Sequence, residues 1–472
     1  MDYVLGIDLG TSYFKLGLFN KEGELCGLGR VYVSKDVGDG SRREVPIDRF
    51  WKLLRQGLQD ACQQAQILPN RIKAVSYSSQ ANSFVLLDKN KNPLTPIILW
   101  CDNRAEGGGN IQDIFHHENF LEKSGLGIEC SHQFCVSKLL WFQQHLPDIW
   151  SQAAYVMTIS DYFTYSLTGQ TAGDAGTASL LGLLNIHTME WQKHIIDLSN
   201  IQFSNQLLPG TVAGRISKKG ATLLGLKTNI PFVVGSLDHH IAGIGAGLGY
   251  IANMSESTGT VLACLKLATE FAPKKNICTG TGLRRDHYYQ LTFDENGAGA
   301  LEWYQKNYAP EYSVNELGQL AKDVEIGSEG LIAKPNAQKY PELEGFINKS
   351  SVHQHAHFIR AILESTAVSL VKLVQHLSGS ILSKRIVATG GGAKNDLWLQ
   401  IKSDLLGVEF ITTKTQEPAC LGAAMFASLS TGWYPDLQTV TQQWVKISKS
   451  FQPIPDNQTK YVEWYKKMKL VE

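Results

Sequence analysis

Residues 5–15 read Leu-Gly-Ile-Asp-Leu-Gly-Thr-Ser-Tyr-Phe-Lys, an apolar run that carries one aspartate and then turns through Gly-Thr-Ser into a second strand-like run. This pattern predicts that Asp8 stands near the end of a strand, just before a turn rich in backbone N–H and hydroxyl donors. A carboxylate beside such a turn suits a magnesium-bound polyphosphate in an open cleft. An ordinary hairpin with a solvated aspartate is the alternative that this stretch alone leaves open.

The composition is that of a globular protein without electrostatic bias. The 472 residues include 44 basic and 44 acidic side chains, and 43% are hydrophobic. Because this length exceeds one ordinary core, we expect two domains, with a cleft available between them. The balanced charge gives no indication of nucleic-acid or anionic-membrane binding.

The sequence predicts a cytoplasmic enzyme. No basic lead-in precedes the first apolar run, and Asp8 interrupts that run, which argues against a secretory signal. No stretch reaches the roughly 18 consecutive apolar residues that a membrane span needs. The eight cysteines form no Cys-x-x-Cys pair, so we expect reduced and mostly buried thiols.

Apolar periodicity predicts an α/β layered protein. Its first two strands are joined by a tight turn, so they are expected to pair antiparallel. Further along, a strand that starts at Pro231 leads into a glycine-rich segment at 241–249, which we interpret as a closely packed helix. The predicted strands are 4–8, 13–19, 72–76, 84–87 and 385–389, and the predicted helices are about 48–66, 137–145 and 358–377, with a last helix that ends at Leu406. Either Asn395 or Asp396 could cap this last helix.

A second β-rich beginning appears near Asn253. The stretch Ser255-Glu-Ser-Thr-Gly-Thr-Val-Leu-Ala-Cys-Leu is similar to the N-terminal turn. We therefore place a domain boundary near Gly249, which gives domains 1–249 and 250–472. The similarity suggests an ancient duplication but is too weak to count as a repeat.

Asp238 is a second carboxylate at a predicted strand end, after the apolar run Phe232-Val-Val. This position suits a general base at the mouth of a sheet, and a helix N-cap is the alternative. His239 and His240 follow directly. Adjacent histidines point in different directions on a regular element, which argues against a metal site here.

Two further turns suit phosphate or nucleotide. Ser257-Thr258-Gly259-Thr260 offers hydroxyls and flexible N–H groups, and Gly390-Gly391-Gly392-Ala393-Lys394-Asn395 joins a strand to a helix without bulky side chains. Ordinary turns are the alternative for both. The chain lacks a P-loop and the protein-kinase triplets, and Gly6-Ile-Asp-Leu-Gly10 is not the dinucleotide fingerprint, so a dehydrogenase loses its main support.

The order of these pieces resembles that of the FGGY carbohydrate kinases, which belong to the fold group of actin, hexokinase and the Hsp70 ATPase domain. The motif style is nearest to xylulokinase-like pentulose kinases. The similarity runs from residue 6 to the segment Ala419-Cys-Leu-Gly-Ala-Ala-Met-Phe. Intermediate matches are Ile98-Leu-Trp-Cys-Asp-Asn-Arg, Asp161-Tyr with Leu167-Thr-Gly, Arg360-Ala-Ile-Leu-Glu, and 390–404.

The resemblance implies two actin-like (ribonuclease H-like) α/β domains with an interdomain cleft for ATP and sugar. Residues 1–249 would form the sugar-binding and catalytic domain, and 250–472 the nucleotide-binding domain. ATP and Mg²⁺ are the implied cofactors, with Asp8 at the magnesium site and Asp238 as the catalytic base that serves phosphoryl transfer to a sugar hydroxyl. The implied phosphate contacts are Thr11, Ser12, Thr258, Gly259 and Thr260, and the residues implied for the adenosine pocket are Gly391, Gly392 and Asn395. Lys15 and Ala393 complete the implied nucleotide contacts.

The substrate side departs from the xylulose kinases, which carry Gln-Met-His-Gly where this chain has Gln80-Ala-Asn82-Ser. Amide side chains can donate to and accept from a polyhydroxyl ligand. The candidate sugar contacts are Gln80, Asn82, Asp102, Arg104 and Asp238. A structural ion pair is the alternative for Asp102 with Arg104, and Trp100 is expected in the core rather than on a sugar face.

A rival function is a non-catalytic or sugar-independent nucleotide-binding regulator of the actin or Hsp70 kind, which the fold alone permits. Asp238 in its sequence context and the polar segment 80–82 favour the kinase. The expected partner is a small sugar, with no nucleic acid and no membrane. The sequence leaves open which sugar and which hydroxyl react, the order of the loop at 334–341, and the oligomeric state, with a homodimer among the options.

Overall fold

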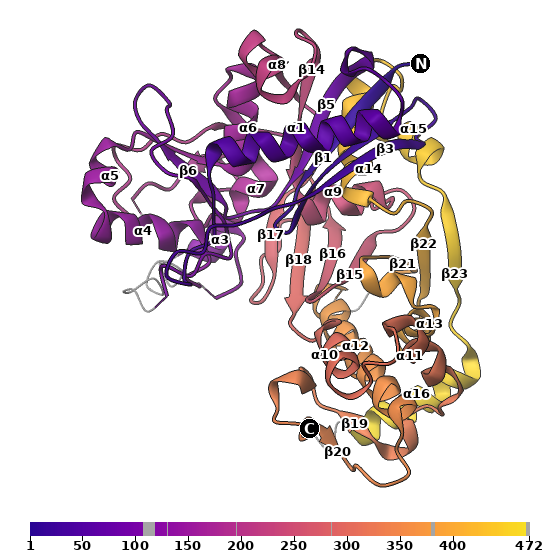
Figure 1. The fold of residues 1–472 in the computed structure, drawn as a ribbon. Coiled ribbons are helices and arrows are strands. Elements are labelled where there is room, and N and C mark those ends of the chain that lie inside the picture. The colour runs from indigo at the N-terminus through magenta and orange to yellow at the C-terminus, as the bar shows by residue number, and fades with distance from the viewer. Residues whose placement is uncertain (107–118, 130, 195, 285, 379–382, 469–472) are drawn as a thin grey trace. The chain divides into compact units, whose positions relative to one another are not determined.

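The computed structural model describes residues 1–106, 119–129, 131–194, 196–284, 286–378 and 383–468. The chain forms two compact units, each built from separated stretches (Figure 1). The first unit contains residues 1–245, 267–290 and 415–445, and the second contains 246–266, 291–414 and 446–472. The division of roles between residues 1–249 and 250–472 stays a prediction.

The first unit is organised around a six-stranded sheet in the order β13-β14-β5-β1-β2-β3. Strand β1 pairs antiparallel with β2, as predicted, and parallel with β5 on its other side. Strand β5 pairs parallel with β14, so β1, β5 and β14 all end at the same edge of the sheet. The strands are β1 (Tyr3–Leu9), β2 (Tyr13–Phe19), β3 (Leu25–Tyr32), β5 (Ile72–Ser79), β13 (Val212–Arg215) and β14 (Pro231–Leu237).

Helices cover this sheet at very short range. Helix α1 (Ile47–Gln64) packs on β2 and β3, while α14 (Pro418–Ser430) packs on β1, β5 and α9 (Asp238–Gly245) (Figure 1). A Cβ atom on Gly6 would lie 2.0 Å from the Cys420 carbonyl oxygen, so only glycine lets α14 approach β1 this closely. The glycine-rich segment at 241–249 is a closely packed helix, as predicted, only as far as Gly245, where α9 ends. A Cβ on Gly245 would lie 1.9 Å from the Pro418 carbonyl oxygen, and residues 246–249 are not helical.

A second, four-stranded sheet in the first unit carries the predicted substrate segment. Its strand order is β4-β7-β6-β8. The predicted strand at 84–87 is present, and the predicted helix at 137–145 begins two residues earlier. The elements are β4 (Glu44–Val45), β6 (Phe84–Leu87), β7 (Ile97–Ile98), β8 (Tyr155–Thr158), α3 (Phe120–Ser124), α4 (Cys135–His145), α5 (Pro147–Gln152), α6 (Ile159–Thr168) and α7 (Ala175–Ser179).

The second unit is built on a sheet in the order β17-β18-β16-β15-β21-β22-β23, in which β17 and the ends of β16 and β18 are counted with the first unit. Strand β15 pairs antiparallel with β16 and parallel with β21, the same arrangement that β1 has with β2 and β5. The strands are β15 (Met254–Thr258), β16 (Leu262–Ala268), β17 (Cys278–Thr281), β18 (Tyr288–Asp294), β21 (Arg385–Thr389), β22 (Glu409–Thr413) and β23 (Ile447–Phe451). This shared topology supports the duplication that the two similar turns suggested.

The helices of the second unit enclose their own core around Ile359, Leu363 and Trp398. The predicted helix at 358–377 is confirmed and extends by a few residues at its start. The Asn395 side chain accepts a hydrogen bond from the Trp398 N–H at 3.0 Å, so Asn395, one of the two residues predicted as the cap, is the cap of α13. The helices are α10 (Gly299–Tyr308), α11 (Val314–Leu320), α12 (His355–Ser378), α13 (Asp396–Leu406) and α16 (Pro455–Met468).

The remaining elements are short connections. They are β9 (Ala172–Asp174), β10 (Leu184–Asn185), β11 (Glu190–Trp191), β12 (Asn205–Leu207), β19 (Ile332–Ala333), β20 (Phe346–Ile347), α8 (Lys218–Leu224), α15 (Leu437–Trp444), and the 3₁₀ turns at 69–71, 321–323, 328–330, 337–339 and 391–394.

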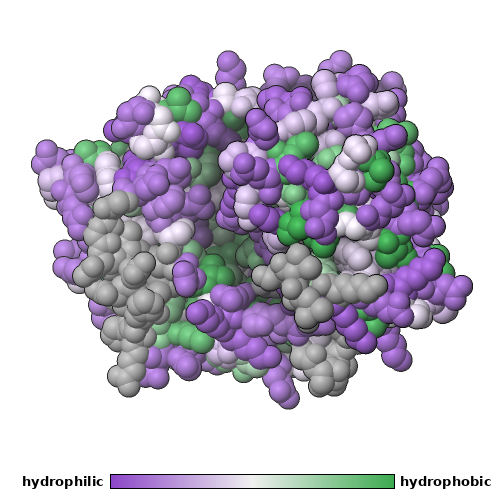
Figure 2. Space-filling model, turned by 90° about the horizontal axis from the view of Figure 1, so that it is seen from below, coloured by the Kyte–Doolittle hydropathy of each residue, from purple (hydrophilic) through white to green (hydrophobic). Residues whose placement is uncertain are grey.

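Most of the described cysteines are buried, as predicted, and the face of the molecule seen in Figure 2 is mainly hydrophilic. In the described chain Cys62, Cys135, Cys264, Cys278 and Cys420 are buried free thiols, and Cys26 and Cys101 are half-buried; Cys130 lies outside the described residues. On the face seen in Figure 2, hydrophilic residues predominate and hydrophobic ones form smaller groups between them. Of the helices that the structure describes, none has the length and apolarity needed to span a membrane.

Candidate active site

Asp8 lies near the end of β1 in a charged but largely buried setting. Its Oδ2 atom lies 3.7 Å from the Lys15 Nζ atom, which in turn lies 2.7 Å from Glu417 Oε2. The Ser78 hydroxyl donates to Asp8 Oδ1 at 3.2 Å. Burial raises the pKa of Asp8 to about 6; the Lys15 ammonium opposes this rise, and the Asp238 and Glu417 carboxylates add to it.

Asp238 is the first residue of α9, directly after β14. Its Oδ1 atom accepts the His239 N–H at 2.7 Å, and its side chain remains partly exposed. Because β14 and β1 are both parallel neighbours of β5, Asp238 and Asp8 lie at the same edge of the sheet, and the influence of Asp238 on the Asp8 pKa reflects this proximity. The first unit therefore brings together Asp8, Lys15 and Asp238.

The two histidines beside Asp238 differ in burial: His239 is half-buried and His240 is buried. His240 is buried, stacks on Tyr289 with ring centroids 4.2 Å apart, and lies 3.4 Å from the Ser236 hydroxyl. Burial lowers the pKa of His240 to about 3, so it packs as a neutral ring. In the described parts of the chain no three histidine, cysteine or acidic side chains are grouped as a metal site.

The turn after β1 is held by its neighbours. The Thr11 hydroxyl donates to Gln80 Oε1 at 3.1 Å and accepts the Trp100 indole N–H at 2.7 Å, while Ser12 is exposed. Trp100 is 37% exposed, so the prediction of a core tryptophan was wrong. Its position depends on Lys138, whose buried ammonium donates to the Trp100 carbonyl at 2.8 Å.

The predicted sugar contacts Gln80 and Asn82 differ in how much of their polar surface is already used. Gln80 is 2% exposed; its amide oxygen also accepts the Ser83 hydroxyl, and its amide nitrogen donates to the Leu9 carbonyl. Asn82 is half-buried, has a left-handed backbone with φ of 58°, and accepts the Cys135 N–H at 3.0 Å. Gln80 therefore holds the turn, whereas Asn82 is the more exposed of the two amide side chains.

Asp102 and Arg104 form the ion pair that the sequence left open as an alternative. Arg104 Nε donates to Asp102 Oδ1 at 2.7 Å, and its Nη2 atom donates to Asp102 Oδ2 at 2.9 Å and to Glu44. Asp102 also accepts the Arg43 N–H at 2.6 Å and is fully buried. Burial raises the pKa of Asp102, but the bonds from Arg104 and Arg43 outweigh it and hold that pKa below its usual value.

The predicted nucleotide turns come together within the second unit. A Cβ on Gly392 would lie 2.6 Å from Thr258 Cβ, so the turn at 391–394 rests directly on the end of β15. Gly391 and Thr260 are exposed, and Gly259, Ala393 and Asn395 are half-buried. The Thr258 side chain, in contrast, is fully buried and donates to Glu256 Oε2 at 2.7 Å, so its hydroxyl faces the interior.

Family models identify this arrangement. The model of the N-terminal domain of the FGGY family of carbohydrate kinases matches residues 3–245, and the model of its C-terminal domain matches residues 333–431. The chain belongs to the FGGY family of carbohydrate kinases.

This FGGY kinase is similar over nearly its whole length to curated relatives. It is 27% identical to a xylulose kinase of Bacillus subtilis (strain 168), covering 98% of this chain and 95% of the relative. It is 26% identical to a gluconokinase of Bacillus licheniformis, covering 91% and 88%. The solved structure of a ligand-bound xylulose kinase from Lactobacillus acidophilus covers 100% of this chain and 98% of its own with a TM-score of 0.88 at 22% identity, which shows the two-domain actin-like fold.

Sequence reasoning missed two charged residues of this FGGY kinase. Glu417 precedes α14 and pairs with Lys15, and Lys402 on α13 pairs with Glu256 at 2.8 Å. Glu417 gave no local signal, because its partner is 402 residues away. Lys402 gave one, because it shares the buried face of its helix with Trp398, Leu399 and Leu406.

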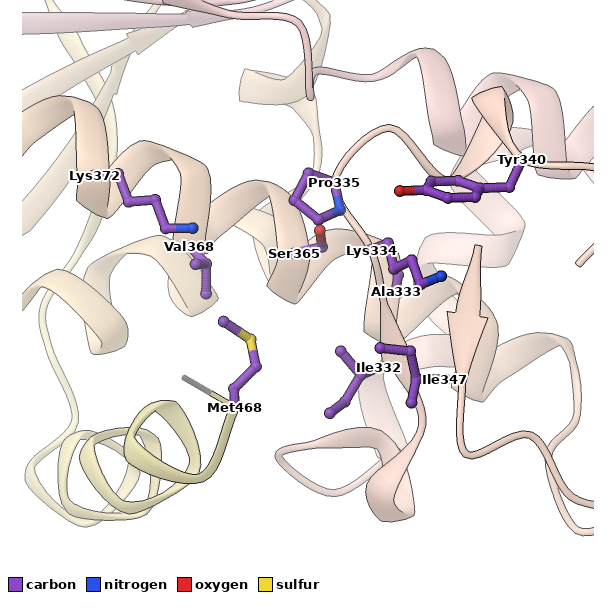
Figure 3. A pocket seen from close by; sticks show the side chains of 10 residues that line it. All are labelled: Ile332, Ala333, Lys334, Pro335, Tyr340, Ile347, Ser365, Val368, Lys372 and Met468. Atoms are coloured by element: carbon purple, nitrogen blue, oxygen red, sulfur yellow. The ribbon is translucent and has the colours of Figure 1, made fainter. Parts of the chain in front are cut away.

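A separate cavity of about 430 Å³ lies within the second unit. The Lys372 and Tyr340 side chains approach it from opposite sides, above the apolar side chains of Ile332, Ile347 and Met468 (Figure 3). The described residues that line this cavity include no predicted site residue, so its size alone does not make it the site of phosphoryl transfer.

Proposed function

We propose that this kinase transfers the terminal phosphoryl group of ATP to a hydroxyl of a small sugar or polyol, with a ketose such as a pentulose favoured. The observation that carries the proposal is the placement of Asp238 and Asp8 at the ends of β14 and β1, the two strands that flank β5, with Lys15 beside Asp8. The relatives named as a xylulose kinase and a gluconokinase support polyhydroxylated acceptors and make pentuloses and sugar acids the first to test.

Asp238 is the proposed general base. Its partly exposed carboxylate would take the proton of the sugar hydroxyl while the hydroxyl oxygen bonds to the γ-phosphorus. The bond from that phosphorus to the bridging oxygen breaks, and ADP leaves with the electron pair. Asn82, a half-buried residue of the same unit, is the amide proposed to contact the sugar. Gln80, Asp102 and Arg104 are engaged in hydrogen bonds within the protein and would act by holding the shape of the sugar site.

Asp8 is the proposed holder of Mg²⁺. The residues fit a hydrated cation, because Asp8 offers carboxylate oxygens near the end of β1 and Mg²⁺ that keeps its waters needs only one or two carboxylates. The Asp238 and Glu417 carboxylates add negative charge at Asp8, which a cation would offset. Bound Mg²⁺ supplies positive charge to the phosphate oxygens as the transfer proceeds. Lys15 would contribute a fixed positive charge at the same place.

The proposed nucleotide contacts come from two separate sets of residues. Thr11, Ser12 and Lys15 belong to the first unit. The second unit supplies exposed backbone at Gly391 and Thr260, with half-buried Gly259, Ala393 and Asn395 beside it. Backbone N–H groups around Gly259 and Thr260 suit phosphate oxygens, and the turn at 391–395, with few bulky side chains, suits the adenosine, which supports this assignment.

A coupled assay for ADP release tests the proposal, run with ATP and Mg²⁺ across pentuloses, hexuloses, heptuloses, polyols and sugar acids. We expect release to depend on one acceptor class and to yield its phosphate ester. The matched control is Asp197→Asn, which changes an exposed carboxylate elsewhere in the first unit. ADP release that no sugar stimulates would contradict the proposal and favour the nucleotide-binding regulator.

A further inference from the structure

Lys402 takes part in a closed set of buried hydrogen bonds at the end of β15. Its Nζ atom donates to Glu256 Oε1 at 2.8 Å and to the Thr258 hydroxyl at 2.7 Å. The Thr258 hydroxyl donates in turn to Glu256 Oε2 at 2.7 Å. The Lys402 and Glu256 side chains are fully buried, so no part of this set reaches solvent.

Such a pair is poorly explained by stability alone. Removing two charges from water costs several kcal/mol per ion, and well-packed apolar side chains of similar volume often serve as well or better. The attested use of a buried ionic group is to specify one arrangement where several would pack. Here the arrangement specified is that of Thr258, since its hydroxyl is bonded to both partners.

Thr258 is the contact that the two nucleotide turns of the second unit share. On one side it leads into Gly259 and the exposed Thr260, where the Gly259 carbonyl accepts the Ala298 N–H at 2.7 Å. On the other side it lies against Gly392, where an added Cβ would come within 2.6 Å of the Thr258 Cβ. A shift of the Thr258 side chain would therefore move both turns.

We propose that Lys402 and Glu256 are positioning residues for the nucleotide phosphates, and that they act through the Thr258 hydroxyl without touching the nucleotide. This inference rests on the proposed function, because it assigns those turns to ATP. The pair fixes the end of β15, and the end of β15 fixes the N–H groups that face the phosphates.

The test compares Thr258→Val with Thr258→Ser, because valine keeps the shape and loses the hydroxyl, whereas serine keeps the hydroxyl. Equilibrium titration with Mg-ADP in the absence of sugar measures affinity, and steady-state kinetics separate the KM for ATP from kcat. We expect Thr258→Val to weaken ADP binding and raise the KM for ATP by about tenfold, the value of a hydrogen bond to a charged group. We expect Thr258→Ser, which keeps the hydroxyl, to lose much less ADP affinity than Thr258→Val. In both variants kcat should change less than the KM for ATP.

Lys402→Met and Lys449→Met extend the test to two lysines at α13. Lys402 lies on this helix, whereas Lys449 lies on β23 and pairs with Asp396 at the start of the helix. Lys402→Met should weaken ADP binding at least as much as Thr258→Val, whereas Lys449 pairs with Asp396 at the surface, 55% exposed, and its change should leave ADP binding unaltered. An unchanged ADP affinity in Thr258→Val together with a lower melting temperature would overturn the inference, and so would equal losses in the valine and serine variants. If the wild-type protein binds no ADP, the proposed function fails as well; if it binds and Thr258→Val binds equally, only this inference fails.

Discussion

Strand β1 in the first unit and strand β15 in the second both lead into a hydroxyl-rich turn, but the charged side chains beside the two turns differ in how exposed they are. In the first unit the side chains of Asp8, Lys15 and Glu417 are 11%, 24% and 14% exposed. In the second unit those of Lys402 and Glu256 are fully buried. The groups proposed to meet an ion or a proton therefore remain partly exposed, whereas the pair proposed to position the backbone is fully buried.

The largest effect is expected from Asp238→Asn in the first unit. Losing a positioned base typically lowers turnover by about 10² to 10⁴, and no contact with the nucleotide is proposed for this side chain. We therefore expect kcat to collapse while Mg-ADP affinity stays near the wild-type value, as measured by steady-state kinetics and by titration. An Asp238→Asn protein with a tenth of the wild-type activity would remove this residue from its role.

Next in size, the free energy of unfolding should distinguish the buried pair of Lys402 and Glu256 from the partly exposed group around Lys15. Lys402→Met leaves Glu256 buried without its cation, which typically costs about 3–5 kcal/mol, whereas the partly exposed Lys15 contributes about 1 kcal/mol or less. Urea unfolding of Lys402→Met and Lys15→Met measures both. The double variant Lys402→Met with Glu256→Leu should regain most of the loss, and equal costs for the two lysine variants would contradict the contrast between sealed and reachable charge.

Glu417→Gln should raise the requirement for Mg²⁺. Without the Glu417 charge, Lys15 keeps Asp8 as its carboxylate partner and competes more strongly with a cation for it. The worth of such a pair limits the shift to about fivefold in the free Mg²⁺ that gives half-maximal rate. The measurement is activity against free Mg²⁺ at saturating ATP, and an unchanged curve would show that Glu417 does not act on Asp8.

The last prediction concerns Asp161, a buried carboxyl on α6 that lies near the Asp174 carboxyl. Burial, with Asp174 adding to it, raises the pKa of Asp161 to about 7. A raised carboxyl pKa means that the folded state holds the proton more tightly than the unfolded state, so this group lowers stability progressively as the pH rises from about 4 to 7. Asp161→Asn should therefore raise the melting temperature more at pH 8.5 than at pH 5, and equal shifts at both values would contradict the assignment.

Features that depend on local sequence were predictable. Asp8 and Asp238 were placed at strand ends because each follows an apolar run. The cap of α13 was narrowed to Asn395 or Asp396 because both precede a helical pattern, and the structure shows that it is Asn395. Trp100 was placed wrongly, because an apolar neighbourhood in sequence does not show that its indole meets Thr11 from another segment. The pairs of Lys15 with Glu417 and of Lys402 with Glu256 join residues 402 and 146 positions apart, a distance that no local pattern spans.

The affinity of Mg-ADP for the wild-type protein, Asp238→Asn and Thr258→Val, measured by titration without sugar, tests the central contrast most directly. With Asp238 assigned to chemistry and the Thr258 turn to holding the nucleotide, affinity should stay within about twofold in Asp238→Asn and fall about tenfold in Thr258→Val. The reverse order, or equal losses in the two variants, would contradict the account.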